Sequence, residues 1–212
     1  MEIMLTAAHE YSVQFSEEQD ALLKEIYAYT IANHAESHMI SGPVQGQFLT
    51  MISKMIRPKR ILEIGTFTGY SALCLAKGLN DAGELHTIEM READAKLAIS
   101  FFEKSSDAQK IKLHIGDAHT ILDQLNEDWD LVFVDADKTG YVQYYEQLLP
   151  KLKQGSWLLF DNVLFHGEVL KDNITGKNAI AIHAFNEHVC KDDRVEKVLL
   201  TIRDGLTLMR KK

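Results

Sequence analysis

The feature that most constrains this chain is a regular alternation of short apolar runs with longer amphipathic segments, from about residue 60 to residue 190. Short apolar runs bounded by turn residues are typical of buried strands, whereas the longer segments have the spacing of helices. Strands that alternate with helices favour a parallel sheet with helical crossovers. We therefore predict an α/β fold.

The expected elements follow one another closely, with no Ser/Gly/Pro-rich linker between them. The last two apolar runs, 195–202 and 206–210, are separated by Arg203-Asp204-Gly205, and Asp-Gly favours a hairpin turn. We therefore expect an antiparallel hairpin at one edge of the sheet. Strands are expected near 60–65, 84–89, 112–116, 130–135 and 156–160, and helices near 70–79, 92–104, 120–125, 141–149 and 179–190.

The first third of the chain is expected to be helical. Ser16 and Gln19 match a capping box, which predicts that a helix begins there. A second helix should run from about 45 to 55 and end before Pro58. The length of 212 residues fits one domain, 1–212, with an N-terminal helical extension at about 1–38.

The charge balance argues against a nucleic-acid partner. Acidic residues outnumber basic ones by 31 to 23, and the net charge is −8. A field of that sign repels phosphate backbones. The sequence has no apolar run of the roughly 18–20 residues that a membrane span needs. It also has no basic and apolar leader, so we expect a cytoplasmic protein with no membrane partner.

A glycine-containing loop joins the first strand to the following helix. Gly65 and Gly69 permit a sharp turn and a close approach of a ligand to the backbone. The loop is not a dinucleotide fingerprint, because position 67 is Phe, and no Gly-Lys-Ser/Thr follows as in a P-loop. The pattern therefore favours a nucleoside ligand without a pyrophosphate. The alternative is that these glycines only form a turn.

Two further strand ends fit the same ligand. Glu89 ends the second strand, where a carboxylate can accept hydrogen bonds from a ribose diol. Asp117 and Ala118 follow the third strand, where a backbone N–H and a short side chain suit an adenine edge. Ligands in open α/β sheets lie outside the carboxyl ends of the strands, so the three segments should meet. Alternatively, Glu89 is a solvated residue at the rim.

Oxygen-bearing side chains follow the fourth and fifth strands. Asp135 ends the fourth strand, and Asp161 and Asn162 end the fifth. Three oxygen donors without thiolate or imidazole suit a hard cation, with Mg²⁺ preferred and Ca²⁺ or Mn²⁺ also fitting. The alternative is an Asx turn or a helix cap at each position.

Lys138 lies three residues after Asp135, at the mouth of the same crevice. Free lysine titrates near 10.4 and is a poor base at neutral pH. A divalent ion and partial desolvation both disfavour the ammonium form, so we expect a lowered pKa and a role as general base. Alternatively, Lys138 is a solvated loop residue.

Taken together, these segments resemble the cation-dependent O-methyltransferases of the caffeoyl-CoA and catechol type, over about residues 39–212. The resemblance implies a Rossmann-like class I methyltransferase fold, in which helices cover both faces of a seven-stranded, mostly parallel sheet with an antiparallel last strand. It also implies S-adenosyl-L-methionine as cofactor and a homodimer. The matching strings are Gly46-Gln-Phe-Leu, Leu62-Glu-Ile-Gly-Thr-Phe-Thr-Gly-Tyr-Ser-Ala, Gly116-Asp-Ala, Phe133-Val-Asp-Ala-Asp-Lys, Asp161-Asn-Val-Leu-Phe-His-Gly, Asp193-Arg-Val and Asp204-Gly-Leu-Thr-Leu.

The resemblance also implies roles for individual residues. Glu89 would hold the ribose, Ala118 beside Asp117 would contact the adenine, and Asp137 would take the amino group of the cofactor. Lys138 would be the general base. The methionine part of the cofactor would be surrounded by Ser41, Glu63, Gly65, Thr66 and Ser71. The metal would be ligated by Asp135, Asp161 and Asn162, and Asp135 would also border the cofactor. The substrate would contact Lys138, Asn162 and His166.

The function that the resemblance implies is methyl transfer to one hydroxyl of a catechol-like or caffeoyl-type vicinal diol. One alternative is an enzyme of the same fold that methylates a hydroxylated uridine in tRNA, for which Lys54, Arg57, Lys59 and Arg60 form a candidate basic patch. A second alternative is a non-catalytic cofactor-binding protein. The metal and lysine set argues against it, because a binding module does not need that chemistry.

Overall fold

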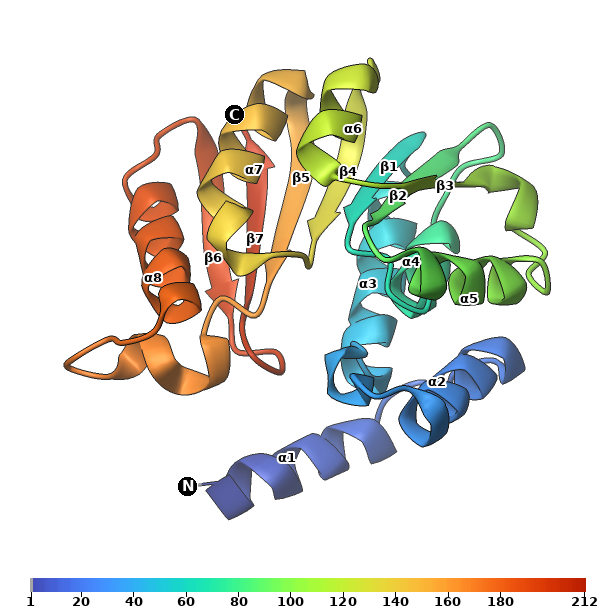
Figure 1. The fold of residues 1–212 in the computed structure, drawn as a ribbon, viewed down its shortest axis with the longest axis horizontal. Helices are drawn as coiled ribbons and strands as arrows, with labels where there is room; N and C mark the ends of the chain where they lie inside the picture. The colour runs from blue at the N-terminus through green and yellow to red at the C-terminus, as the bar shows by residue number, and fades with distance from the viewer. Residues whose placement is uncertain (1) are drawn as a thin grey trace.

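The computed structural model describes residues 2–212. Seven strands form one sheet in the order β3-β2-β1-β4-β5-β7-β6 (Figure 1). β7 pairs antiparallel with β5 and β6, and the other neighbours are parallel. The predicted mostly parallel sheet with an antiparallel last strand is therefore confirmed. The strands are β1 (Arg60–Ile64), β2 (Glu84–Glu89), β3 (Ile111–Ile115), β4 (Trp129–Val134), β5 (Leu152–Asp161), β6 (Val195–Leu200) and β7 (Leu206–Lys211).

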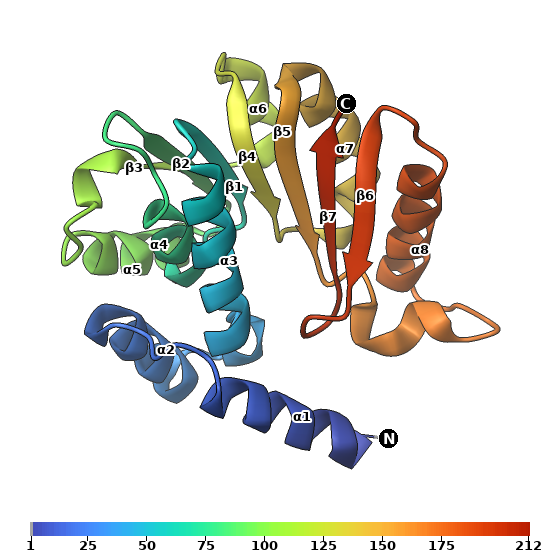
Figure 2. The same ribbon diagram turned by 180° about the vertical axis from the view of Figure 1, so that it is seen from behind.

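Helices cover both faces of the sheet, as Figures 1 and 2 show from opposite sides. Strand side chains alternate between the two faces, so Phe133 packs with one group of helices and Val134 with the other. One apolar core includes side chains of α2, α3, α4 and α5, and the other those of α6, α7 and α8. The helices are α1 (Glu2–Gln14), α2 (Ala21–Asn33), α3 (Pro43–Ile56), α4 (Tyr70–Ala76), α5 (Glu92–Phe102), α6 (Ala118–Gln124), α7 (Tyr141–Leu148) and α8 (Lys177–Cys190).

The predicted helix start at Ser16 is wrong. α2 begins at Ala21, and the side chain of Asp20 caps it by accepting a hydrogen bond from the Leu23 backbone N–H at 2.9 Å. Ser16 instead follows α1, where its hydroxyl donates to the Ser12 carbonyl oxygen at 2.6 Å. Gln19 is also engaged elsewhere, because its amide donates to the Tyr70 hydroxyl. A local capping pattern was therefore outweighed by a second capping residue and a tertiary contact.

Two other predicted boundaries differ from the structure. β5 begins at Leu152 rather than near 156, because Leu152 pairs with Trp129 ahead of a register shift in the β4–β5 ladder. The predicted loop after β5 contains a short 3₁₀ segment, Phe165–Leu170, with left-handed backbone at His166 and Gly167. Bulges and single turns of this kind have little periodicity for sequence analysis to detect.

The closing hairpin is confirmed, and its loop contacts the segment that follows β5. The Val163 N–H donates to the Gly205 carbonyl oxygen at 3.1 Å, and the Leu164 N–H donates to the Asp204 carbonyl oxygen at 2.9 Å. The His166 N–H donates to Asp204 Oδ1 at 2.6 Å. The hairpin loop therefore fixes the backbone just beyond the predicted metal-binding residues.

The N-terminal helices lie across the edge of the sheet at which the parallel strands end (Figure 1). Gly42, with φ 79°, and Pro43 mark the turn into α3, which then packs on the sheet. Between residues 2 and 212, no helix is both long and apolar enough to cross a membrane.

Candidate active site

A cavity of about 1500 Å³ lies at the carboxyl ends of β1, β2, β4 and β5, where the sequence predicts the ligands. Residues of α1, of α2 and of the 3₁₀ turn Ser37–Met39 line its other side, together with the hairpin loop 201–204. The cavity is larger than a typical single-ligand pocket of about 300–1000 Å³. The predicted site residues that line it are Ser41, Gly65, Thr66, Ser71, Glu89, Ala118, Asp135, Asp137, Lys138, Asn162 and His166.

Three predicted residues do not line this cavity. Glu63 and Asp161 are fully buried behind its wall. Asp117 is exposed and caps α6, where its carboxylate accepts hydrogen bonds from the Thr120 backbone N–H and hydroxyl, both at 2.9 Å. The structure therefore assigns Asp117 a capping role, which is the alternative that Asp residues after strands commonly follow.

The glycine loop after β1 packs directly against the loop after β4. Gly65 has φ 101°, a left-handed conformation that favours glycine. A Cβ at this position would lie 2.0 Å from the Asp135 carbonyl oxygen, far inside van der Waals contact. The N–H groups of Gly65 and Thr66 donate to the Ile88 carbonyl oxygen at 3.0 and 3.2 Å. Glycine at 65 therefore allows the candidate cofactor loop and the candidate metal loop to touch.

The Glu89 carboxylate is held in place by backbone donors. The Phe67 N–H donates to Oε2 at 2.7 Å, and the Arg91 N–H donates to Oε1 at 2.8 Å. Glu89 is buried, yet it lines the cavity. Carboxylate oxygens carry further lone pairs, so both remain able to accept from ligand hydroxyls. This geometry fits the predicted ribose-binding role.

Glu63 lies beneath the cofactor loop. Its Oε2 accepts a hydrogen bond from the Thr87 hydroxyl at 2.5 Å, whereas its Oε1 has no partner among the described residues. Burial raises the pKa of Glu63 to about 8. A cationic ligand above Glu63 would favour the ionised form, and a protonated Glu63 would instead donate a hydrogen bond.

Asp161 is the most deeply placed of the candidate metal ligands. Its Oδ2 accepts a hydrogen bond from Gln45 Nε2 at 2.7 Å, whereas Oδ1 has no partner among the described residues. Burial, followed by the nearby Asp135 carboxylate, raises the pKa of Asp161 to about 7. Asn162 follows with φ 57°, a conformation that Asn tolerates better than most residues. A buried anionic oxygen without a donor fits a cation.

Lys138 links the carboxyl ends of β4 and β5, where the candidate metal ligands lie. Its Nζ donates to Asp135 Oδ1 at 2.7 Å and to the Tyr141 hydroxyl at 2.8 Å. That hydroxyl in turn donates to the Asp161 carbonyl oxygen at 2.7 Å. These contacts connect the Asp135 side chain to the Asp161 backbone, and the Asp135 carboxylate lies near enough to Asp161 to raise its pKa.

The expected lowering of the Lys138 pKa is wrong for the protein groups alone. Burial lowers the pKa of Lys138, but the Asp135 carboxylate and the Tyr141 hydroxyl outweigh that effect and raise it above its ordinary range. This ion pair was not predicted, because Asp135 was expected to bind the metal and border the cofactor, and Tyr141 was given no role at the site. Lys138 is therefore a charged hydrogen-bond donor in this arrangement.

A second group of ligand-type side chains lies away from the cavity. Atoms of Glu146, His188 and Asp192 come within 4.8 Å of one another. Arg194 donates to Glu146 at 2.7 Å and to Asp192 at 2.9 Å, and His188 lies 2.7 Å from Glu146. Protein cations already compensate these carboxylates, so the group is an ion-pair network rather than a candidate metal centre.

Sequence analysis also missed residues that complete the site. Gln45 carries no catalytic signature, and only its position next to the Gly46 string could have drawn attention to it. The wall formed by Ala8, His9 and Ser12 of α1 had no recognisable motif. Arg203 closes the opposite side, where its guanidinium donates to the His38 carbonyl oxygen at 2.9 Å.

Comparisons with known proteins agree with this geometry. A sequence model of the O-methyltransferase family matches residues 11–212. Caffeoyl-CoA O-methyltransferase 1 of Eucalyptus globulus is 36% identical over 200 residues, which cover 89% of this chain and 81% of that protein.

Solved structures agree as well. Podospora anserina methyltransferase PaMTH1, bound to SAH, has a TM-score of 0.92 at 28% identity, covering 100% of this chain and 96% of that one. The Bacillus cereus O-methyltransferase in complex with SAH has a TM-score of 0.89 at 29% identity, with 97% of each chain covered. The predicted family and fold class are confirmed. The chain therefore belongs to the O-methyltransferase family, as an S-adenosylmethionine-dependent enzyme of the caffeoyl-CoA type with the class I methyltransferase fold.

Proposed function

We propose that this enzyme requires a divalent cation and methylates one hydroxyl of a small vicinal diol, with S-adenosylmethionine bound at the glycine loop. The observation that carries the proposal is Asp161 Oδ1, a fully buried carboxylate oxygen that has no hydrogen-bond partner among the described residues and lies near Asp135 beneath the cavity wall. Buried carboxylates of this kind are normally paired or coordinate a metal.

Several residues of the cavity are suited to bind the cofactor. Glu89 presents a fixed carboxylate to a ribose, and Ala118 offers a small surface to an adenine. Gly65 permits the backbone to approach the ligand, while Ser41, Thr66 and Ser71 line the cavity beside it. Asp137 also lines the cavity and offers a carboxylate to the amino group. When bound, S-adenosylmethionine supplies an electrophilic methyl group on a sulfonium.

The proposed cation-binding site contains only oxygen ligands. Asp135, Asp161 and Asn162 would hold the ion, and Mg²⁺ suits this donor set best. When bound, such an ion lowers the pKa of a coordinated hydroxyl and orients two neighbouring oxygens. A vicinal diol is the acceptor class that can offer two such oxygens, which supports a catechol-like or caffeoyl-type substrate.

Lys138 is the proposed catalytic residue. Its ammonium is held by Asp135 and Tyr141 at the cavity wall and stays charged at neutral pH. A positive charge near an acceptor hydroxyl favours the ionised oxygen, which is the nucleophile in methyl transfer. Lys138 then acts by stabilising negative charge on the acceptor, and the proton leaves to solvent or to the opposite wall. His166 and Asn162 border the same space.

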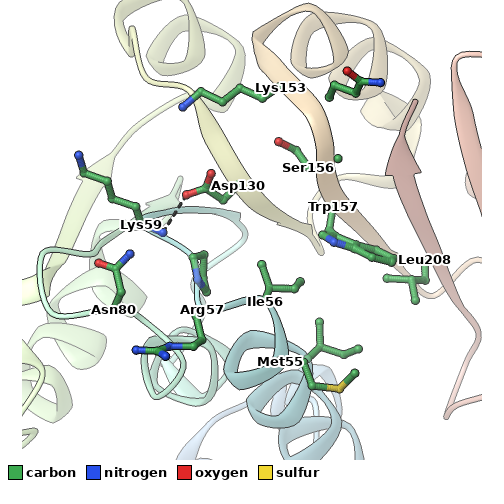
Figure 3. Close-up of a pocket in the computed structure, with 14 residues that line it drawn as sticks. Met55, Ile56, Arg57, Lys59, Asn80, Asp130, Lys153, Ser156, Trp157 and Leu208 are labelled. Carbon is green, nitrogen blue, oxygen red and sulfur yellow. Dashed lines mark hydrogen bonds between the residues drawn. The ribbon is translucent and has the colours of Figure 1, made fainter.

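The tRNA alternative has less support. Arg57 and Lys59 line a separate cavity of about 720 Å³ at the amino ends of β1, β4 and β5, shown in Figure 3. Arg60 is paired with Glu127 at 2.9 Å. Arg57, Lys59 and Arg60 therefore lie at the opposite end of the strands from the cofactor loop, which does not favour them as a surface that guides a tRNA base to the proposed site.

A methylation assay tests the proposal. Vicinal diols and matched monophenols are incubated with methyl-labelled S-adenosylmethionine, with Mg²⁺ or with EDTA. We expect product only from the diols and only with the cation. Full activity in EDTA would contradict the cation requirement, and equal turnover of monophenols would contradict the acceptor class. The homodimer expected from the resemblance stays a prediction, which sedimentation velocity can test.

A further inference from the structure

Gln45 connects the first turn of α3 to the end of β5, across 116 positions of sequence. Its side chain is buried, with 1% of the residue exposed, and its amide Nε2 lies 2.7 Å from Asp161 Oδ2. The next residue, Gly46, lets α3 pack closely on α4, because a Cβ there would lie 2.8 Å from the Tyr70 ring. The local packing therefore places Gln45 firmly over the carboxylate.

Gln45 and Asp161 have more hydrogen-bond acceptors than donors available to them. The amide nitrogen of Gln45 faces Asp161 Oδ2, and an amide N–H group only donates, so Gln45 is the donor in this contact. Within residues 2–212, neither Asp161 Oδ1 nor Gln45 Oε1 then has a hydrogen-bond donor, although both are buried. Two neighbouring acceptors in this state disfavour a purely structural role for the contact.

We propose that Gln45 is a positioning residue for cation binding. By donating to Oδ2, it fixes the orientation of the Asp161 carboxylate and leaves Oδ1 as the oxygen available to the ion. The inference rests on the proposed function, since it assumes a cation at Asp161, and it adds a residue outside the set predicted to ligate that ion. Mutation of a residue that orients a metal ligand typically weakens metal affinity by about 10- to 100-fold.

The experiment compares Mn²⁺ binding by the wild type, Gln45→Met and Thr50→Val, followed by electron paramagnetic resonance. Thr50 is the matched control, because it is also buried on α3 and its hydroxyl bonds the Cys74 carbonyl oxygen at 3.2 Å, away from the cavity. We expect Gln45→Met to weaken Mn²⁺ binding about 10- to 100-fold. Thr50→Val should bind Mn²⁺ like the wild type, and SAH affinity should be unchanged in both variants.

Kinetics provide a second readout that a merely structural role would not produce. In Gln45→Met, the Mg²⁺ concentration for half-maximal activity should rise, while kcat at saturating Mg²⁺ should return to within about threefold of the wild type. A loss of kcat that saturating Mg²⁺ does not restore would overturn the positioning role. Unchanged Mn²⁺ affinity, or equal weakening in Gln45→Met and Thr50→Val, would overturn it as well.

One measurement needs no variant. In the wild type, the side-chain amide resonances of Gln45 should shift on titration with Mg²⁺, with the same midpoint as the titration of activity. Resonances that do not respond to Mg²⁺, in a protein that binds it, would overturn the inference alone. A wild type that binds no Mn²⁺ and keeps full activity in EDTA would overturn the cation requirement of the proposed function, and this inference with it.

Discussion

Replacing Asp161 with Asn should stabilise the cation-free protein while removing cation binding. Burial and the Asp135 carboxylate raise the pKa of Asp161 from an ordinary 3.8 to about 7. At about 1.36 kcal/mol for each pKa unit, ionising this side chain in the folded protein costs roughly 4 kcal/mol. The Asn side chain has nearly the same shape, carries no charge, and keeps one oxygen that can accept the hydrogen bond from Gln45 Nε2.

The sign of the pH dependence follows from the raised pKa. Below pH 3.8 the carboxyl group is protonated in both folded and unfolded chains, so it costs no stability. As pH rises toward 7, the unfolded chain loses the proton first, and wild-type stability falls. The free energy of unfolding, measured in urea, should therefore favour Asp161→Asn by little near pH 4 and by roughly 4 kcal/mol at pH 8. Equal stabilities at pH 8 would refute the reasoning.

Mg²⁺ should reduce this difference in stability. At about 100 times its dissociation constant, a ligand that binds only the folded chain adds roughly 2.7 kcal/mol. The wild type should gain that stability, and Asp161→Asn should not. Glu63→Gln is the matched control, because burial also raises the pKa of Glu63, to about 8, yet Glu63 is outside the proposed cation set. It should show the same pH effect and keep the Mg²⁺ response.

Two further variants test the chemistry and the packing of the site. Lys138→Met should lower kcat about 100-fold or more at pH 7. It should also move the rising limb of the pH–rate profile to higher pH, because no ammonium group then favours the ionised acceptor. A rising limb that does not move would contradict the electrostatic role of Lys138. Gly65→Ala should lower the free energy of unfolding by about 2–4 kcal/mol and abolish cofactor binding in fluorescence titrations, because its Cβ would meet the Asp135 carbonyl oxygen. Gly42→Ala is the control, since it shares a positive φ but has nothing within 4 Å of the added Cβ; equal losses in the two alanine variants would show that strain alone, not the contact, decides.

Sequence periodicity predicted most of the fold, because burial on both faces gives the central strands continuous apolar runs. β1, β2 and β4 were located to within a residue or two for this reason. α1 was not predicted as a separate helix, since its sequence shows no clear apolar face and its Tyr11 is exposed. The extra length of β5 depends on a register shift that only the partner strand reveals.

Sequence position located the part of the candidate site that consists of side chains at strand ends. Strand ends converge in a parallel sheet, so the carboxylates Glu89, Asp135 and Asp161 were candidates from their place after a strand, and Glu89 and Asp135 line the cavity. Contacts between distant segments could not be found in this way. The donor from Gln45 and the ion pair of Lys138 depend on how α3 and α7 pack, and that ion pair reverses the direction expected for the lysine pKa.

The wall formed by α1 and the turn Ser37–Met39 places one side of the cavity on a different stretch of the chain from the proposed chemistry. The strand-end loops that carry the chemistry all begin beyond residue 60, whereas this wall belongs to the first forty residues. Exchanging residues 1–38 for those of a relative should therefore transfer the relative's preference among diols while the methyl-transfer machinery stays intact. An enzyme built in this way can diversify its chemical repertoire by replacing one contiguous stretch of its gene.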